Sequence, residues 1–244
     1  MRQRIGVVKA LFRYPVKSMA GEALDSASLG WSGLEGDRRF AFGRTADGGG
    51  FPWLTAGRLP SLILYRPFRS VDAKGVQPDQ VETPGGEKLP LQSEELRREL
   101  SLRHGADVQL MHLNHGMFDE APLSLITVAT IGAIGQAAGM TLDVRRFRPN
   151  ILIETDTPTA FAENEWPGGI VSFGEGPAVA RVGLTMKDIR CGMLNIDPDT
   201  AAVAPEVLKV TVRDNQNCAG AYGFTLAAGV VSVGDSVYLR KGEE

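Results

Sequence analysis

Short alternations of apolar and polar residues, interrupted by turn-forming residues, constrain the fold of this chain more than any other feature. Alternate side chains of a strand point to opposite faces, so this period of two predicts half-buried strands. Turns such as "TPGGEK" at 83–88 separate the strands, because glycine adopts positive φ at no steric cost. Examples of the alternation are the pairs Ile5 and Val7, Phe40 and Phe42, and Leu62 and Leu64.

Two segments depart from this period and predict helices. Residues 93–100, "SEELRREL", begin with a capping serine, carry acidic residues in the first turn and place Leu96 and Leu100 on one face. Residues 124–139 bring three isoleucines toward one face and end in glycine. Further strands are predicted at 150–154, 178–186, 207–213 and 233–240.

The order of these elements predicts a mainly β fold, built as β-barrels with a few helices. Strands and helices do not alternate as they do in a doubly wound sheet. The chain has 244 residues, 43% of them hydrophobic, which is enough for one large core or two smaller ones. We place a β-rich N-terminal domain over 1–105 and a second β-barrel domain over 106–244.

Charge and cysteine content argue against several classes of protein. The net charge is -3 and no long block of like charge is present, so neither nucleic acid nor a membrane surface is an expected partner. No apolar run reaches the ~20 residues of a membrane-spanning helix, and no signal-peptide cleavage pattern follows the basic start. Two cysteines cannot build a disulfide framework. We therefore expect a cytoplasmic protein.

Common nucleotide-binding and hydrolase motifs are absent from the sequence. It contains no GxxxxGK[ST] phosphate loop and no GxSxG elbow. His112 and His115 have a spacing that suits a metal only on a helix, whereas residues 106–113 alternate like a strand. Solvated or hydrogen-bonded histidines are thus the simpler interpretation, with a metal site as the alternative.

Cys191 is the most informative single residue. A lone cysteine is commonly an inert, buried, small hydrophobe, and that alternative stays open. However, Lys187 and Arg190 precede it and an Asp-Pro-Asp-Thr turn follows, so we place it where a strand ends. Nearby positive charge favours the thiolate, which is the nucleophilic form and a ligand for soft metals. Cys218 lacks close cationic neighbours, and we expect it to be a packing residue.

Three basic stretches accompany this cysteine: "YPVKS" at 14–18, "GDRRFAF" at 36–42 and "RRFRPNILIE" at 145–154. Arginine binds phosphates and carboxylates through paired hydrogen bonds. A solvated basic turn is the alternative for each stretch alone. Together they predict a site that gathers arginine, lysine and hydroxyl groups around a thiolate, which suits an anionic, phosphate-bearing cofactor with a soft metal.

These stretches, in this order and together with "VGDSVYL", resemble the MOSC family, named for the C-terminal domain of molybdenum-cofactor sulfurase. The chain is most similar to the subgroup with an additional N-terminal β-barrel domain, which includes the mitochondrial amidoxime-reducing component and its bacterial relatives. The resemblance covers nearly the whole chain. Its most specific parts are Arg-Phe-Arg-Pro-Asn at 146–150 and Arg-Cys followed by Asp-Pro-Asp-Thr at 190–200.

The resemblance implies the molybdenum cofactor, a molybdopterin, with Cys191 as the metal ligand and the catalytic residue. The cationic side chains would neutralise the cofactor phosphate, while Ser18 and Asn150 would hydrogen-bond its polar edges. Pyridoxal phosphate binding is a further property implied for the family. The residues at cofactor-contact positions are Lys17, Ser18, Arg38, Arg148, Asn150 and Arg190.

The chain departs from this subgroup at four positions. Ile189 replaces a small polar residue, Asn195 replaces a threonine, and Glu120 and Ala121 replace a Thr/Ser pair of the mitochondrial relative. These departures bear on the choice of substrate more than on cofactor binding.

The resemblance implies an oxidoreductase that reduces N-hydroxylated or related N-oxygenated small molecules. The ferredoxin-like module of larger bacterial relatives is not found here, so electrons are expected from a separate electron-transfer protein, a flavin reductase with a small electron carrier. One alternative is a carrier of molybdenum cofactor or of persulfide sulfur without reductase activity. Another is a β-barrel binding module without the cofactor.

Overall fold

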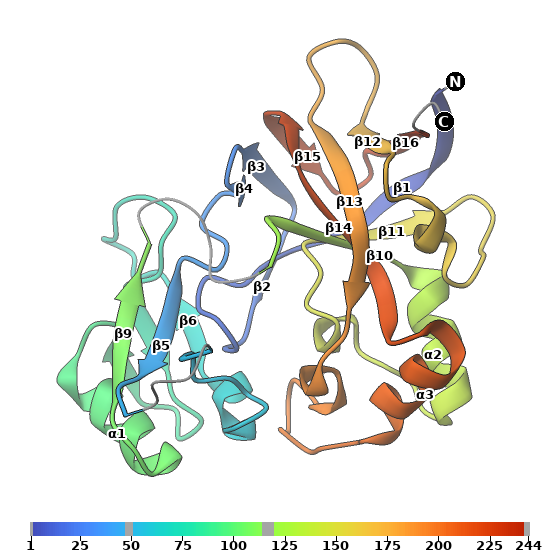
Figure 1. Ribbon diagram of the computed structural model, residues 1–244. Coiled ribbons are helices and arrows are strands. Elements are labelled where there is room, and N and C mark those ends of the chain that lie inside the picture. The colour runs from blue at the N-terminus through green and yellow to red at the C-terminus, as the bar shows by residue number, and fades with distance from the viewer. Residues whose placement is uncertain (1, 47–50, 114–119, 242–244) are drawn as a thin grey trace.

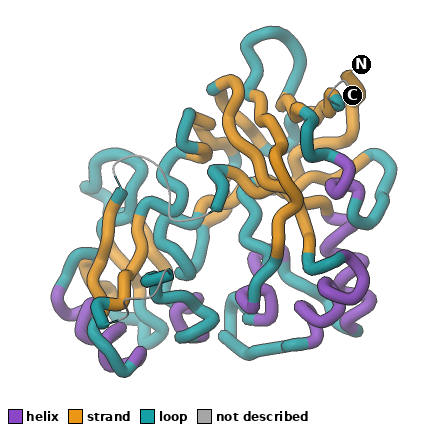
Figure 2. The backbone as a smooth tube through the Cα atoms, viewed as in Figure 1, coloured by secondary structure: helices purple, strands orange, loops and turns teal. Residues whose placement is uncertain are grey.

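The chain folds into two lobes that meet along one side (Figure 1). This computed structural model describes residues 2–46, 51–113 and 120–241. The larger lobe is built around a closed β-barrel, and the smaller lobe around two short sheets. Figure 2 shows strands through the middle of both lobes and most helical segments along their lower margins. The described residues include three α-helices, which confirms the prediction of a mainly β, barrel-containing fold.

Seven strands close the barrel of the larger lobe. Alternate side chains, including Val8, Leu125, Ile153 and Val182, fill its interior. Neighbouring strands are antiparallel except β10 and β11, which are parallel. Around the barrel, the order is β1 (Arg2–Arg13), β11 (Ile151–Thr155), β10 (Leu123–Thr127), β14 (Cys218–Ala227), β13 (Arg181–Ile189), β12 (Ile170–Phe173) and β16 (Ser236–Arg240).

Strand β1 closes the barrel because it pairs on one side with β11 and on the other with β16. Its first residues lie beside the last strand, with Arg2 opposite Arg240. Short strands extend this lobe: β2 (Glu22–Leu24) joins β1, and β3 (Ser26–Gly30) pairs with β4 (Gly33–Leu34) and β15 (Gly229–Ser232). Segments from the start and the end of the chain therefore complete the same structure.

The smaller lobe holds its own hydrophobic core. Predicted helix 93–100 is confirmed as α1 (Glu94–His104), with Ser93 Oγ accepting a hydrogen bond from the Leu96 amide at 3.2 Å. Leu62 and Leu64 lie in a 3-10 helix over Pro60–Leu64, not in the strand that their alternation predicts. The strands are β5 (Phe40–Arg44) with β9 (Val108–His112), and β6 (Arg66–Phe68), β7 (Gln80–Glu82) and β8 (Lys88–Pro90).

Helices α2 (Val128–Ala138) and α3 (Glu206–Asn215) pack together against the barrel. The predicted helix 124–139 is half right, since its first residues belong to β10 and the helix begins after Thr127. The predicted strand 207–213 is wrong, because this segment is α3. Its buried residues Val207, Val210 and Thr211 follow the spacing of one helical face.

The boundary placed between residues 105 and 106 stays a prediction. Strands from both sides of that boundary share the barrel, since β1 belongs to the first part of the chain and its partners β11 and β16 to the second. Within the described ranges, no helix combines the length and the apolar character needed to cross a membrane.

Gly6 permits the close approach of β1 and β11. A Cβ atom at this position would lie 2.1 Å from the carbonyl oxygen of Glu154. We expect Gly6→Ala to lower the free energy of unfolding by on the order of 1–3 kcal/mol, as overpacking does, measured from urea midpoints. Gly132→Ala is the control, because a Cβ there meets nothing within 4 Å. Equal midpoints for the two variants would contradict this account of the seam.

Candidate functional site

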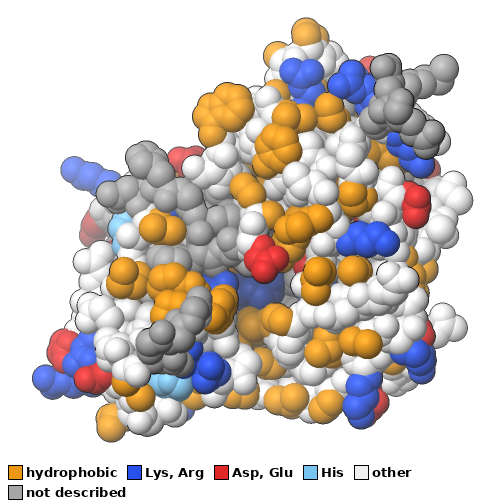
Figure 3. Space-filling model, viewed as in Figure 1, with side chains coloured by type: hydrophobic (Ala, Val, Ile, Leu, Met, Phe, Trp, Pro, Cys, Tyr) orange, Lys and Arg blue, Asp and Glu red, His pale blue; other side chains and the backbone are white. Residues whose placement is uncertain are grey.

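A cavity of about 810 Å³ lies between the two lobes. Figure 3 shows basic side chains in a recess on this face, with hydrophobic side chains beside them. All of the residues predicted to form the site line the cavity except Asn150. Those that line it are Lys17, Ser18, Arg38, Arg148, Arg190 and Cys191.

A buried ion pair lies at the floor of this cavity, where the smaller lobe meets the barrel. The Asp37 carboxylate pairs with the Arg38 guanidinium and accepts a hydrogen bond from the Tyr14 amide at 2.7 Å. Arg38 also donates to Asn150 Oδ1 at 3.2 Å and to the carbonyl oxygen of Arg148 at 2.9 Å. One guanidinium thus connects the turn before β5 with the segment that enters β11.

Asn150 lies behind the cavity and is fully buried. Its Oδ1 accepts a second hydrogen bond from the Ser124 amide at 3.1 Å, and its Nδ2 donates to the carbonyl oxygen of Phe12 at 3.4 Å. The side chain therefore acts on the cavity through Arg38. Direct hydrogen bonding from Asn150 to a cofactor stays a prediction.

Three of the cavity residues have left-handed backbone conformations. The φ angles are 66° at Ser18, 47° at Arg38 and 50° at Arg148. Non-glycine residues rarely adopt this region, and such strain persists only where surrounding contacts hold it. A hydrogen bond of 2.6 Å from Arg148 Nη1 to the carbonyl oxygen of Met19 is one such contact.

The buried ring of Tyr14 supports two arginines at once. The guanidinium carbons of Arg38 and Arg148 lie 5.3 Å and 4.1 Å from its ring centroid. Burial raises the pKa of the Tyr14 phenol well above its usual range, although the charges of Arg148 and Arg38 oppose the shift. The neutral ring offers its negative face to both cations, which helps two like charges to lie close together.

Arg190 forms a second cationic point in the cavity wall. It pairs with Asp188 and donates to the carbonyl oxygen of Phe147, while Asp188 accepts a hydrogen bond of 2.7 Å from Ser124 Oγ. Burial lowers the pKa of Arg190, but the charges of Asp188, Tyr222 and Cys191 and the hydrogen bond to Asp188 together leave the pKa raised. Within the part of the chain that the structure describes, the buried Nε of Arg190 has no hydrogen-bond partner.

Cys191 follows directly on β13 and Arg190, and its side chain is exposed in the cavity. The prediction that it lies at the end of a strand is confirmed, and the alternative of a buried cysteine is wrong. The loop after it is anchored on both sides, because Leu194 packs in the core beneath α2 and α3 and Ile196 in the core of the smaller lobe. Cys218 is buried, as expected for a packing residue.

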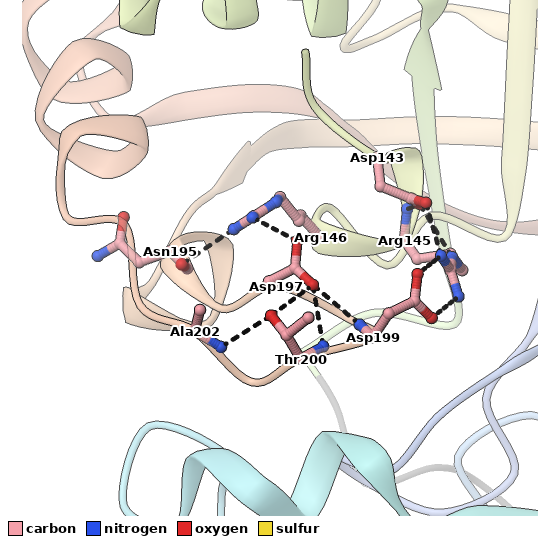
Figure 4. A network of polar contacts seen from close by, with 8 residues as sticks. All are labelled: Asp143, Arg145, Arg146, Asn195, Asp197, Asp199, Thr200 and Ala202. Atoms are coloured by element: carbon pink, nitrogen blue, oxygen red, sulfur yellow. Dashed lines mark hydrogen bonds and ion pairs between the residues drawn. The ribbon is translucent and has the colours of Figure 1, made fainter. Parts of the chain in front are cut away.

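Two arginines of the "RRFRPN" stretch bind acidic residues of the loop beyond Cys191 (Figure 4). Arg145 forms ion pairs with Asp143 at 2.7 Å and Asp199 at 2.6 Å. Arg146 pairs with Asp197 at 2.9 Å. These two arginines are occupied by the protein itself, and neither lines the cavity. Of the three arginines in this stretch, Arg148 is the one that remains a candidate ligand contact.

The four positions at which the chain departs from the subgroup it resembles lie in different environments. Asn195 Oδ1 accepts a hydrogen bond from the Leu208 amide at 2.9 Å and so caps the first turn of α3. Ile189 is 63% exposed and lines the cavity, as does Glu120. Ala121 is buried. Two of the departures therefore change the surface that a ligand would meet.

The two described histidines, His104 and His112, have separate surroundings. His112 lines the cavity and stacks on Phe40, with ring centroids 4.2 Å apart, while burial and then the charge of Arg39 lower its pKa. His104 lies at the end of α1, and His115 lies outside the described residues. No group of three or more metal-ligating side chains occurs among the residues described.

The sequence analysis missed the apolar residues of the site, among them Phe51, Trp53 and Met111 in the smaller lobe. Apolar residues in a strand-forming region usually belong to a core. Only the partial exposure of these side chains at the junction of the lobes distinguishes them. No sequence signal available in one chain separates the two cases.

Two family models match the chain. The MOSC domain model covers residues 103–238, and the MOSC N-terminal beta barrel domain model covers residues 5–119. The chain belongs to the MOSC family. MOSC domains are associated as a family with binding of the molybdenum cofactor. The two matches overlap, so they leave the predicted domain boundary open.

The YUAD protein, whose structure is solved, has the same fold at low identity. The YUAD protein from Bacillus subtilis is 12% identical, with a TM-score of 0.55, and the match covers 100% of this chain and 99% of that one. YiiM from Escherichia coli is 13% identical, with a TM-score of 0.44 over 100% and 72% of the two chains. No curated protein matches the chain. Specific relationship to the amidoxime-reducing subgroup, pyridoxal phosphate binding and cytoplasmic placement stay predictions.

The Asp197 carboxylate should make the loop beyond Cys191 sensitive to acid. Partial burial raises the pKa of Asp197. The hydrogen bonds from the Thr200 hydroxyl and from the Asp199 and Thr200 amides, together with the charge of Arg146, have the larger combined effect and leave this pKa below its ordinary value. A carboxylate of this kind stabilises the fold above its unfolded-state pKa, and the contribution is lost as pH falls through the folded-state pKa.

We expect Asp197→Asn to reduce the free energy of unfolding at pH 7 by on the order of 1–3 kcal/mol. The difference from the unchanged protein should narrow as pH falls from about 4 toward 2, measured by urea unfolding at each pH. Asp199→Asn is the control, since its side chain is 55% exposed and such pairs contribute little. A difference that is constant across this pH range would contradict the assignment.

Proposed function

We propose that this MOSC protein binds the molybdenum cofactor between its lobes, with Cys191 as the metal ligand, and reduces N-hydroxylated or related N-oxygenated small molecules. The observation that carries the proposal is the position of an exposed cysteine thiol in one cavity with four cationic side chains. These are Lys17, Arg38, Arg148 and Arg190.

Several features of the cavity fit such a cofactor. Its volume, about 810 Å³, lies within the range of cofactor and ligand sites. Thiolate is a suitable ligand for a soft metal, and neighbouring cations favour the deprotonated form. The buried Nε of Arg190, which lacks a hydrogen-bond partner among the described residues, is a donor that an anionic group would satisfy.

The protein groups would hold the cofactor at its charged end. Arg38 and Arg148, stacked on Tyr14, present guanidinium groups that suit phosphate oxygens. Ser18 and Lys17 line the same cavity and would bring a hydroxyl and an ammonium group. The strained backbones of Ser18, Arg38 and Arg148 are fixed by the fold, so little ordering would remain for binding.

The proposed reaction converts R–NH–OH, two electrons and two protons into R–NH2 and water. When bound, the cofactor would supply the two-electron abstraction of the substrate oxygen. The chain would orient the substrate N–O group near Cys191. Glu120 lines the cavity, and we propose it as a group that exchanges protons with the substrate, with protons replenished from solvent.

The cofactor assignment is tested by elemental analysis for molybdenum and by pterin fluorescence after oxidation. We expect Cys191→Ser to lower molybdenum content at least ~10-fold, because the hydroxyl is a poor substitute for thiolate, while Cys218→Ser keeps it. Circular dichroism checks that both variants remain folded. Equal molybdenum content in the two variants would remove Cys191 as the ligand.

A matched pair of arginines serves as a second arm of this test. Arg148→Ala removes a charge-assisted contact and should weaken cofactor retention about tenfold or more during dialysis. Arg145→Ala should retain the cofactor, because Arg145 pairs with Asp143 and Asp199 outside the cavity. Identical retention would show that the cavity arginines do not bind it.

Electron supply provides a separate prediction. The sequence contains no flavin or nicotinamide fingerprint and no cysteine cluster for iron–sulfur centres. We expect the holoprotein to be inactive with NADH or NADPH alone, and active with a chemical one-electron reductant or with a flavin reductase and small electron carrier. NADH-driven turnover by the pure chain would contradict this. Full molybdenum loading without turnover under any reductant would favour the carrier function instead.

A further inference from the structure

The smaller lobe turns an apolar surface toward the cavity. We call Phe51, Trp53 and Met111 the apolar shelf; all three line the cavity. Phe51 is 55% exposed and Met111 is 45% exposed, while Trp53 is half-buried. Large apolar side chains that stay accessible inside a concave site are available to cover an apolar ligand.

The strand pairing of the smaller lobe brings two of these side chains together. Trp53 forms a bridge with Gly43 of β5, and Met111 of β9 lies opposite Ala41. A Cβ at Gly43 would lie 3.7 Å from both the Met111 Cγ and the Trp53 ring. The two side chains therefore lie on the same face of the sheet and approach each other over a residue that has no side chain.

The opposite wall and the floor of the cavity complete the environment. Ile189, next to Arg190 and Cys191 at the end of β13, is 63% exposed and lines the other side. The Lys17 ammonium lies 5.7 Å from the ring centroid of Phe51. The shelf thus adjoins the cationic floor, so one occupant can contact an apolar surface and a charged one at the same time.

We propose that the apolar shelf binds the flat, apolar body of the substrate while its N–O group lies toward Cys191. The ligand class is an aromatic N-oxygenated compound rather than a small aliphatic one. This inference rests on the proposed function for the role of Cys191, whereas the preference for an aromatic body rests on the shelf itself. Trp53 and Met111 are the specificity-determining residues.

The test compares two ligands with the same head group, benzohydroxamic acid and acetohydroxamic acid. Binding to the holoprotein is measured without reductant by calorimetry and by quenching of tryptophan fluorescence. Burying a phenyl ring in place of a methyl group should make benzohydroxamic acid bind at least about tenfold more tightly. Met111→Ala and Trp53→Ala should each remove most of that preference and leave the Kd of acetohydroxamic acid unchanged.

Trp31→Ala is the matched control, because Trp31 is 76% exposed and does not line the cavity. It should keep the phenyl preference and the quenching. Molybdenum content is measured for every variant and should be unchanged by the shelf substitutions. Met111→Ala changes an exposed side chain, so it preserves the test if Trp53→Ala fails to fold.

The outcomes separate the two proposals. Equal affinity for the two ligands in a molybdenum-loaded protein would overturn the role of the shelf and leave the proposed function standing. Absence of molybdenum would overturn the proposed function. In that case, tighter binding of benzohydroxamic acid would still support the role of the shelf, and equal binding of the two ligands would contradict it. A preference that survives Met111→Ala and Trp53→Ala would place the aromatic site elsewhere and overturn the inference.

Discussion

The ion pair between Asp37 and Arg38 is the interaction on which the junction of the two lobes depends. Both side chains are almost completely buried, and a buried charge is tolerated only when it is paired and hydrogen-bonded. Asn150 and the backbone of Arg148 supply the remaining contacts. The floor of the cavity is consequently part of the folded core, and its charged groups are ordered before any ligand arrives.

Three arginines that look alike in the sequence, Arg145, Arg146 and Arg148, have different contacts. Arg145 and Arg146 hold the loop beyond Cys191 through Asp199 and Asp197, whereas Arg148 lies on the ring of Tyr14 inside the cavity. The first two stabilise the turn beyond Cys191 from outside the cavity. The third places its charge in the cavity wall, so one basic stretch supplies both a structural contact and a candidate ligand contact.

The sequence predicts the features that depend on local chemistry. The cap at Ser93 and the end of a strand before Cys191 depend on residues that are close in the sequence, and the structure contains both. Segment 207–213 misleads because its β-branched residues fit a strand as well as one face of a helix. The burial of Asn150 and the exposure of Met111 depend on partners distant in the chain, which periodicity does not report.

The closure of the barrel has a consequence for how the chain reaches its native state. β1 is hydrogen-bonded to β16, so residues from nearly opposite ends of the chain must meet before the ring of strands is complete. Pairing across such a long span is slow, because the entropy of closing a large loop is lost before the contacts form. During synthesis β1 is made before β16. Until β16 can pair with it, that edge of β1 stays open to pairing with other chains.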